Sequence, residues 1–210
     1  MFSRVAGGAF FFYNKNMADT KINRCDWGTR GGTLMERYHD KEWGVPLFND
    51  REIFEFLVLE SAQAGLSWLI VLRKRGGYKK AFASFDFKKV ARFTARDVAR
   101  LVKNPDIIRN RAKIEAAVNN AKRFLEIRKE FGTFSNYAWQ FVDNKPIVKD
   151  RKSMSDLPAK TNEAELWAKD LKKRGFKFLG ATVMYAHMQA TGMVNDHVIN
   201  CFRFKEVARK

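Results

Sequence analysis

The sequence predicts an all-α fold, and three observations support that prediction. Apolar residues recur at helical spacing in several segments that begin at capping residues and end at glycines. No alternating strand pattern persists along the chain. The links between these segments are short, roughly two to six residues, which favours a compact helical bundle. With 210 residues, 46% of them hydrophobic, the chain suits one domain with a substantial core.

The first expected helices lie in the N-terminal half of the chain. Asn49 with Glu52 resembles a capping box, and apolar residues at helical spacing follow it. The stretch GLSWLIVLRKR continues with an apolar run that ends in cations, as the C-terminus of a helix prefers. Thr94 with Asp97 opens the helical stretch ARDVARLV.

The middle of the chain predicts one long amphipathic helix, beginning at Asp106 and stopped by Gly132. Ser135 is expected to open the helix NYAWQFV. The segment 145–160 holds two of the four prolines and predicts a long loop. Thr161 is expected to cap the helix EAELWAKDLKKR that follows.

The stretch KKRGFKFLGATVMYAHMQ predicts two helices joined by a tight glycine turn. Glycines at 175 and 180 permit positive φ and a close backbone approach. The second helix starts near Ala181, where free N–H groups can hold a phosphate oxygen. Four cations surround the turn: Lys172, Lys173, Arg174 and Lys177. This pattern is typical of a hairpin that grips the DNA backbone, and its alternative is an ordinary turn with solvated lysines.

The charge of the chain indicates a polyanionic partner. Lys and Arg number 40 against 23 Asp and Glu, which gives a net charge of +17. Because no helix carries Lys and Arg on one face only, nucleic acid is favoured over a membrane surface. A generic basic surface is the alternative. No apolar run reaches spanning length, and the two widely separated cysteines predict a reducing, cytoplasmic location.

Residues 1–22 are expected to be a basic, disordered arm of unknown function, and Met17 is a possible start codon. Residues 23–210 then form a single domain. We expect this domain to be a monomer, associated with the nucleoid through its DNA partner.

Five rare residues predict a metal site, because the chain has only three histidines and two cysteines. His197 and Cys201 stand at i and i+4, so on a helix they would share one face and hold one metal ion. Cys25 and His39 form a second pair near the other end of the domain. These four residues have the Cys₂His₂ composition of a closed, structural Zn²⁺ site, and four ordinary buried residues are the alternative. The remaining histidine, His187, is interpreted as a core or surface residue.

A zinc ion on this set would clasp the first ordered segment to the last. By analogy with covalent crosslinks, such a clasp contributes at most roughly 5 kcal/mol to stability.

Six motifs resemble the 3-methyladenine DNA glycosylase I family, a branch of the helix-hairpin-helix DNA glycosylase superfamily. They are CDW, YHDKEWGVP, LESAQAGLSW, IIRNRAKI, LKKRGFKFLG and VNDHVINC, and together they span residues 25–201. The resemblance implies a helix-hairpin-helix bundle with a zinc site. It also implies an enzyme that flips N3-methyladenine out of alkylated double-stranded DNA and hydrolyses its N-glycosidic bond. A monofunctional enzyme of base excision repair, leaving an abasic site, is therefore expected.

The resemblance further implies roles for individual residues. The family's zinc ligands fall on the four residues found above. Its pocket glutamate matches Glu60, the expected catalytic residue. Its base-binding residues match Trp27, Tyr38, Glu60 and Trp68. Residues expected to contact DNA are Gln63, Leu66, Lys173, Arg174, Gly175, Lys177 and Gly180.

Chemistry agrees with a role for Glu60, since an ionised carboxylate among indoles would favour a cationic base over neutral adenine. The alternative is a solvated glutamate beside core tryptophans. Many enzymes of the superfamily place a catalytic Asp at the position of Asn195, and an amide cannot act as a general base. Asp196 is adjacent but displaced by one residue. A base made positive by alkylation is a good leaving group, so we expect extrusion and binding to suffice.

Three other functions stay open on the sequence alone. The first is a non-enzymatic, zinc-stabilised DNA-binding module. The second is a glycosylase for another lesion, such as 7-methylguanine or hypoxanthine, because Met35 and Arg37 precede Tyr38 where another aromatic is expected. The third is binding of RNA or an anionic membrane through the N-terminal arm.

Overall fold

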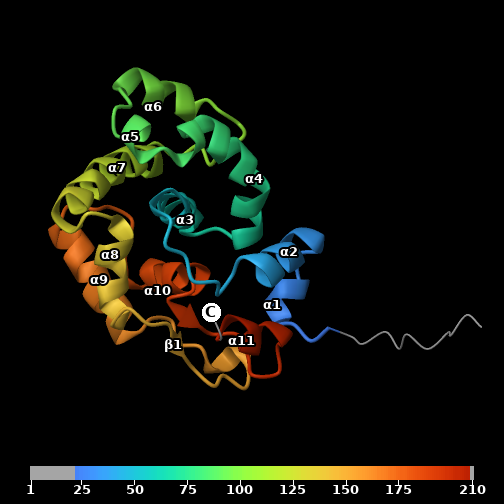
Figure 1. Ribbon diagram of the computed structural model, residues 1–210. Helices are drawn as coiled ribbons and strands as arrows, with labels where there is room; N and C mark the ends of the chain where they lie inside the picture. Colours follow the sequence, from blue (N-terminus) through green and yellow to red (C-terminus); the bar gives the residue numbers. More distant parts are fainter. Residues whose placement is uncertain (1–21, 209–210) are drawn as a thin grey trace, which may run out of the picture.

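The computed structural model describes residues 22–208 as a mostly helical protein (Figure 1). The expected N-terminal arm therefore lies outside the described residues, apart from Ile22. The α-helices of the described part are α1 (Asp26–Thr29), α2 (Thr33–Lys41), α3 (Asp50–Gln63), α4 (Trp68–Ala81), α5 (Phe87–Val90), α6 (Ala95–Val102), α7 (Arg111–Phe131), α8 (Phe134–Trp139), α9 (Asn162–Lys173), α10 (Ala181–Ala190) and α11 (Phe202–Val207). Short 3₁₀ turns span Ala83–Phe85, Gln140–Val142 and Met154–Asp156. No helix among residues 22–208 is long and apolar enough to cross a membrane.

Helix α3 occupies the middle of the fold and packs against α4, α7, α8 and α10 (Figure 1). Nearly every residue in its second half is buried, because it meets neighbours on several sides. Aromatic rings fill the space between α3 and α7, where Phe54 and Phe124 approach edge to face with ring centroids 5.4 Å apart. This central helix ends at Gln63 and so carries Glu60 in its last turn.

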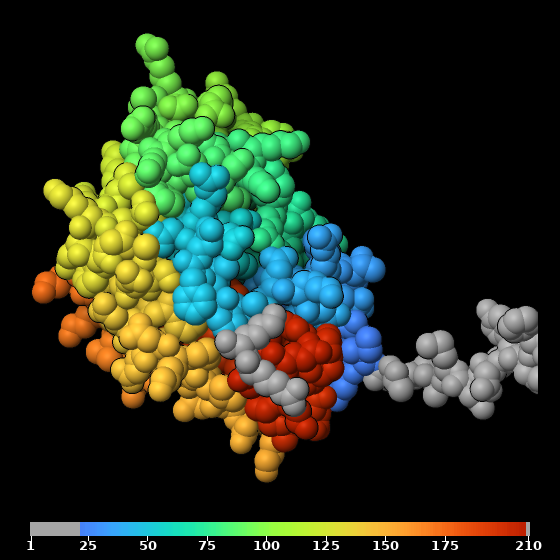
Figure 2. Space-filling view, viewed as in Figure 1, coloured from blue at the N-terminus to red at the C-terminus, as the bar shows by residue number. Residues whose placement is uncertain are grey.

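The two ends of the described chain pack against each other. In Figures 1 and 2, α1 and α2 (blue) lie beside α11 (red). The backbone N–H of Phe202 donates to the carbonyl of Asn23 at 3.0 Å. A second, smaller core holds both segments together and includes Cys25, Met35, Tyr38, Trp43 and Cys201.

Two short parallel strands interrupt the helical pattern. Strand β1 (Ile147–Val148) pairs with β2 (Val194–Asn195) in register Ile147 with Val194, and an isolated bridge joins Arg151 to Val198. Strands of two residues are too short to leave an alternating pattern, so the sequence did not reveal them. The pairing keeps residues 194–198 extended. The predicted helical turn holding His197 and Cys201 is therefore wrong.

Several predicted caps are confirmed. Asn49 accepts hydrogen bonds from the N–H groups of Arg51 and Glu52, and Thr94 forms a full capping box with Asp97. Thr161 accepts from the N–H of Ala164 at the start of α9.

Two predicted helix starts are wrong. Helix α8 begins at Phe134, one residue before Ser135, because Thr133 caps it by accepting from Asn136. The long helix begins at Arg111 rather than Asp106, since the Asn110 side chain caps it by accepting from the N–H of Lys113. In both cases a polar side chain a few residues from the expected boundary supplies the cap.

Candidate active site

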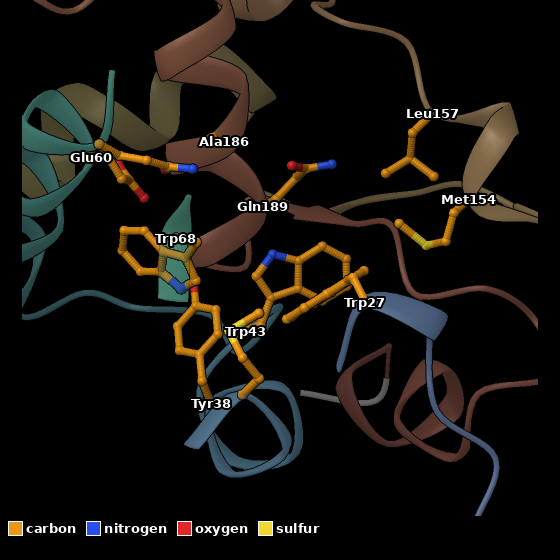
Figure 3. Close-up of a pocket in the computed structure, with 11 residues that line it drawn as sticks. Trp27, Tyr38, Trp43, Glu60, Trp68, Met154, Leu157, Ala186 and Gln189 are labelled. Carbon is orange, nitrogen blue, oxygen red and sulfur yellow. The ribbon is translucent and has the colours of Figure 1, made fainter. Parts of the chain in front are cut away.

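A cavity of about 280 Å³ lies between α2, α3, α4 and α10 (Figure 3). Its walls contain all four residues that the sequence predicted to bind a base. The residues that line it are Trp27, Met35, Tyr38, Trp43, Glu60, Gln63, Trp68, Met154, Leu157, Ala186 and Gln189. This volume and its mostly apolar walls are suited to a flat ligand of small-molecule size.

Aromatic rings form most of the cavity wall. Trp27 meets Trp43 edge to face at a centroid separation of 4.9 Å, and Tyr38 lies 5.3 Å from Trp68. Tyr38 and Trp43 are buried, whereas Trp27 and Trp68 are half-buried and have ring area free. Met35 also lines the cavity, where the sequence analysis expected another aromatic. Indole and phenol faces at this spacing can stack on a planar heterocycle.

Glu60 is the buried carboxylate of the cavity, with 3% of its surface exposed. One carboxylate oxygen, Oε2, lies 2.7 Å from Nδ1 of His187. The other, Oε1, is buried and has no hydrogen-bond partner among the described residues. Burial raises the pKa of Glu60, and the hydrogen bond with His187 opposes that rise. Burial and the charge of Glu60 also raise the pKa of Tyr38 well above its usual value.

An unpartnered buried oxygen is costly unless a ligand satisfies it. Glu60 therefore presents an acceptor that a bound base with an N–H group would complete. The buried Nε1–H of Trp68, another residue of the cavity wall, also has no partner in the described chain.

Asp196 does not line the cavity, but it binds Gln189, which does. It is fully buried, and its carboxylate accepts from Arg151 Nε at 3.0 Å, from the Tyr185 hydroxyl, and from Gln189 Nε2 at 2.9 Å. These bonds leave the Gln189 amide oxygen on the Glu60 side of the cavity in Figure 3. The neighbouring Asn195 donates to the Phe204 carbonyl at 3.0 Å and is likewise outside the cavity.

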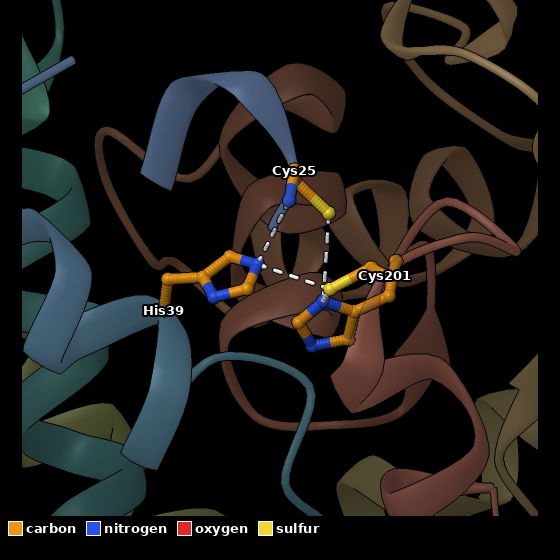
Figure 4. A group of neighbouring side chains, drawn as sticks. Cys25, His39 and Cys201 are labelled. Carbon is orange, nitrogen blue, oxygen red and sulfur yellow. Dashed lines mark hydrogen bonds between the residues drawn. The ribbon is translucent and has the colours of Figure 1, made fainter. Parts of the chain in front are cut away.

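Cys25, His39, His197 and Cys201 converge into one buried cluster that could hold a metal ion (Figure 4). Their donor atoms all lie within 4.8 Å of one another. The Cys201 sulfur is 3.5 Å from both His39 Nε2 and His197 Nδ1, and the Cys25 sulfur is 3.6 Å from His197 Nδ1. Hydrogen bonds from Cys25 and the two imidazoles lower the pKa of the Cys201 thiol, which favours the thiolate form that metals bind.

The far nitrogens of both imidazoles are held by hydrogen bonds. Nδ1 of His39 lies 2.8 Å from Asp40, and Nε2 of His197 lies 3.1 Å from the carbonyl of Trp43. Such outer contacts fix the tautomer and orientation of a ligating histidine. Gly44 has φ +79°, and a Cβ there would lie 3.0 Å from His197 Nε2, so a larger residue would press on this ring.

The predicted hairpin consists of α9 and α10, which pack against each other and are joined by residues 174–180. Gly175 has the positive φ expected of it, +84°, but Gly180 has φ −74° and Phe178 takes the left-handed conformation at φ +59°. Gly180 is the N-cap of α10 and offers no side-chain cap, so the first N–H groups of α10 lack a side-chain acceptor.

The cations of the turn differ in their surroundings. Lys173 and Lys177 are exposed. Arg174 instead donates to Asp170 at 2.7 Å and to Glu130 at 2.7 Å, and its guanidinium lies over the Phe131 ring. Arg174 is therefore held by its own protein, whereas neither lysine side chain forms an ion pair within residues 22–208.

Two asparagines of α7 brace the hairpin turn, and no local sequence pattern predicted this role. Asn119 donates to the Gly175 carbonyl at 2.8 Å. Asn120 donates to the Lys177 carbonyl at 2.9 Å and accepts from the Lys177 N–H at 2.9 Å. Together these bonds fix the backbone on which Lys177 stands.

Gln63 and Leu66, two of the residues expected to contact DNA, lie at the end of α3 and in the loop that joins it to α4. Leu66 is 37% exposed. A second cavity of about 210 Å³ shares Glu60, Gln63 and Ala186 with the first and is also lined by Leu66. The loop thus borders the same space as the first turns of α10.

Lys113 supports this loop from α7. It is 9% exposed, and its Nζ donates to the carbonyls of Ala62 at 2.8 Å and Ala64 at 2.6 Å. A lysine at the C-terminal end of a helix satisfies carbonyls that the helix leaves free.

The structure thus brings the predicted base-binding set together and gathers the four predicted metal ligands. Sequence reasoning missed His187, Gln189 and the contribution of Met154 and Leu157. The last two come from the segment expected to be a plain loop. No local pattern marks any of these residues, because their contacts are made with distant parts of the chain.

An apolar cavity with a buried carboxylate, bordered by an exposed loop and a basic hairpin, is the arrangement of a protein that takes up a base extruded from DNA. The chain belongs to the methyladenine glycosylase family, whose profile matches residues 27–204. DNA-3-methyladenine glycosylase of Haemophilus influenzae is 47% identical over 178 residues, which cover 85% of this chain and 96% of that protein. DNA-3-methyladenine glycosylase 1 of Escherichia coli is 44% identical over 180 residues, covering 86% and 96%.

Solved structures show the same architecture. A crystal structure of 3-methyladenine DNA glycosylase I matches with a TM-score of 0.83 at 44% identity, covering 86% of this chain and 98% of the other. The Staphylococcus aureus enzyme, described as showing the basis of 3-methyladenine recognition, matches with a TM-score of 0.83 at 39% identity, covering 86% and 96%.

Proposed function

We propose that this chain is a monofunctional DNA glycosylase that releases 3-methyladenine from alkylated DNA. The observation that carries the proposal is Glu60, buried among aromatic rings with one carboxylate oxygen unpaired. Relatives of this family at more than 40% identity bear the name of that activity. The Glu60 oxygen is suited to the exocyclic N–H of a methylated adenine, and its charge is suited to the cationic ring.

The positive charge of the methylated base, held in this cavity, favours cleavage of the N-glycosidic bond. The extruded nucleotide carries its positive charge on the methylated ring, which Trp27, Tyr38 and Trp68 can contact on its faces. As the C1′–N9 bond breaks, its electron pair neutralises the base, and water adds to the sugar cation with loss of a proton. This chemistry needs no nucleophile from the protein. None of the residues lining the cavity is a lysine, which supports hydrolysis without strand cleavage.

The α9–α10 hairpin and residues 63–66, at the end of α3 and in the loop that follows, are proposed to hold the DNA. Lys173 and Lys177 are suited to phosphates, and the N-terminus of α10 offers backbone donors at Gly180 and beyond. Gln63 lines both cavities and Leu66 lines the second, so both residues can fill the gap that an extruded base leaves. The contacts of Arg174 with Asp170 and Glu130 support a bracing role for that residue instead of a direct phosphate contact.

We propose zinc as the metal of the Cys25, His39, His197 and Cys201 cluster. Zinc bonds of about 2.3 Å to sulfur and 2.0–2.1 Å to nitrogen, at a tetrahedral angle, place sulfur and nitrogen about 3.6 Å apart. The observed separations of 3.5 and 3.6 Å fit that geometry. Four protein ligands leave no open position, so the ion would be structural and would take no part in cleavage.

Base release tests the enzymatic proposal. The purified chain, incubated with methylated duplex DNA, is expected to release free 3-methyladenine, detected by chromatography, and to leave unbroken strands containing abasic sites. Tight binding of the DNA without any free base would identify a non-enzymatic binding module. Release of 7-methylguanine or hypoxanthine in preference would assign a different lesion. Size-exclusion chromatography with light scattering is expected to give a monomer.

A further inference from the structure

His187 lies directly behind the cavity wall, against Glu60. Its neighbours Ala186 and Gln189 line the cavity, whereas the His187 ring points between α3 and α9. Both side chains of the His187–Glu60 pair are almost fully buried, at 1% and 2% exposure, and their atoms Nδ1 and Oε2 are 2.7 Å apart. The Trp167 ring meets the imidazole at a centroid distance of 5.5 Å and an angle of 64°, so its plane is constrained as well.

We infer that His187 is a positioning residue for base excision: its neutral imidazole donates Nδ1–H to Oε2 of an ionised Glu60 and leaves Oε1 as the acceptor for the base. This inference rests on the proposed function, because it takes Glu60 as the group that binds the methylated adenine.

The hydrogen bonds around the pair support the neutral imidazole. An imidazolium has two N–H groups, each of which needs an acceptor in a buried site. Within residues 22–208, Glu60 is the one hydrogen-bond partner found for the His187 ring. A neutral ring needs a single acceptor, and Glu60 supplies it. The pair then keeps one negative charge, which an imidazolium would cancel.

The retained charge and the fixed geometry serve recognition together. A carboxylate in an aromatic cavity could rotate and turn either oxygen to the ligand. Binding of Oε2 by His187 removes that freedom, so the ordering cost falls before the base arrives. It also explains why one oxygen of a buried carboxylate has no partner in the described chain.

Nitrogen NMR on the full chain labelled at histidine tests the protonation state directly. We expect His187 in the Nδ1–H tautomer at neutral pH, and a changed nitrogen shift in the Glu60→Gln variant. A bare Nδ1 with the proton on Nε2 would mean that Glu60 holds the proton and donates it, and this result would overturn the inference. The measurement needs no excision activity, so it stands even if the wild type releases no 3-methyladenine.

Two substitutions separate positioning from packing. His187→Leu keeps apolar bulk but cannot donate, whereas His187→Asn places an amide N–H near the position of Nδ1–H. We expect His187→Leu to lower single-turnover excision by about 10- to 100-fold, the range of one hydrogen bond to a charged group. His187→Asn should recover most of that rate. Affinity for duplex DNA is expected to stay within about threefold of wild type in both variants, because a buried residue at position 187 does not contact the DNA backbone.

A double-variant cycle completes the test. In the Glu60→Ala background, His187→Leu should cause no further loss of excision, because the side chain that His187 positions is already absent. Additive losses, or losses that follow the melting temperatures of both His187 variants, would show that His187 acts only through packing. A wild type without excision would contradict the proposed function. An active wild type with an equally active His187→Leu variant would contradict this inference alone.

Discussion

Glu60→Gln separates recognition of the charged base from the shape of the cavity. Glutamine has nearly the same size as glutamate and can still accept the Nδ1–H of His187, but it carries no charge. A hydrogen bond to a charged group contributes about 1.5–3 kcal/mol. Two unit charges about 4 Å apart at an effective dielectric of 20 attract by about 4 kcal/mol. We therefore expect the single-turnover release of 3-methyladenine to fall by about 10²- to 10³-fold.

The same variant should be more stable than the wild type at neutral pH. Burial raises the pKa of Glu60 in the folded protein above its value in the unfolded chain. The contribution of Glu60 to the free energy of unfolding is therefore favourable at pH values below the unfolded pKa, and it is lost as the pH rises through the folded pKa. Glu60→Gln removes the charge, so it should raise the free energy of unfolding at pH 7 and change it little near pH 4. Denaturant unfolding at both pH values measures the difference.

The control is Glu52→Gln, an exposed glutamate in the first turn of the same helix, which should change neither excision nor its pH dependence. Wild-type excision by Glu60→Gln would refute the recognition argument. A Glu60→Gln variant less stable than wild type at pH 7 would show that the carboxylate is a structural ion pair, not a strained binding group.

The other predictions concern the metal cluster, Asp196 and the DNA-binding elements. The purified chain should hold one zinc ion per molecule by metal analysis, and Cys201→Ser should lower both zinc content and melting temperature. Asp196→Asn should retain excision but lose about 2–4 kcal/mol of stability in denaturant unfolding, because Asp196 lies outside the cavity in a buried network; abolished excision in a folded variant would make it catalytic. Lys173→Ala should weaken DNA binding and reduce its salt dependence by about one unit of slope, whereas Arg174→Ala should chiefly lower the melting temperature. Leu66→Ala should reduce excision more than DNA affinity, measured by single-turnover assay and fluorescence anisotropy.

Most helices were predictable from local signals, although the caps of α7 and α8 were missed. Asn49 and Thr94 cap their helices as the sequence indicates, and Gly132 ends the long helix with φ +79°. The strands β1 and β2 were not predictable, because each has two residues and their pairing joins segments far apart in the chain.

The four residues of the predicted metal cluster do come together in the structure, while metal binding itself stays a prediction. One of the reasons for grouping them was wrong. The rarity of cysteine and histidine identified the four residues, and that reasoning does not depend on secondary structure. The expectation of a shared helix face failed because residues 194–198 pair with the segment near β1, and Cys201 instead precedes α11 as its N-cap. His187 was left as a core or surface residue because its partner, Glu60, lies on a different helix.

The burial of the two cysteines protects their sulfur atoms from alkylation. Electrophiles that methylate adenine also attack thiolates. Cys25 and Cys201 are the only two cysteines of the chain, and they are 0% and 3% exposed within the cluster. Trp27 stands two residues after Cys25, and Tyr38 directly precedes His39, so damage to the cluster would reach the aromatic wall of the cavity. Sequestering these sulfurs lets the protein persist under the same chemical stress that creates its substrate.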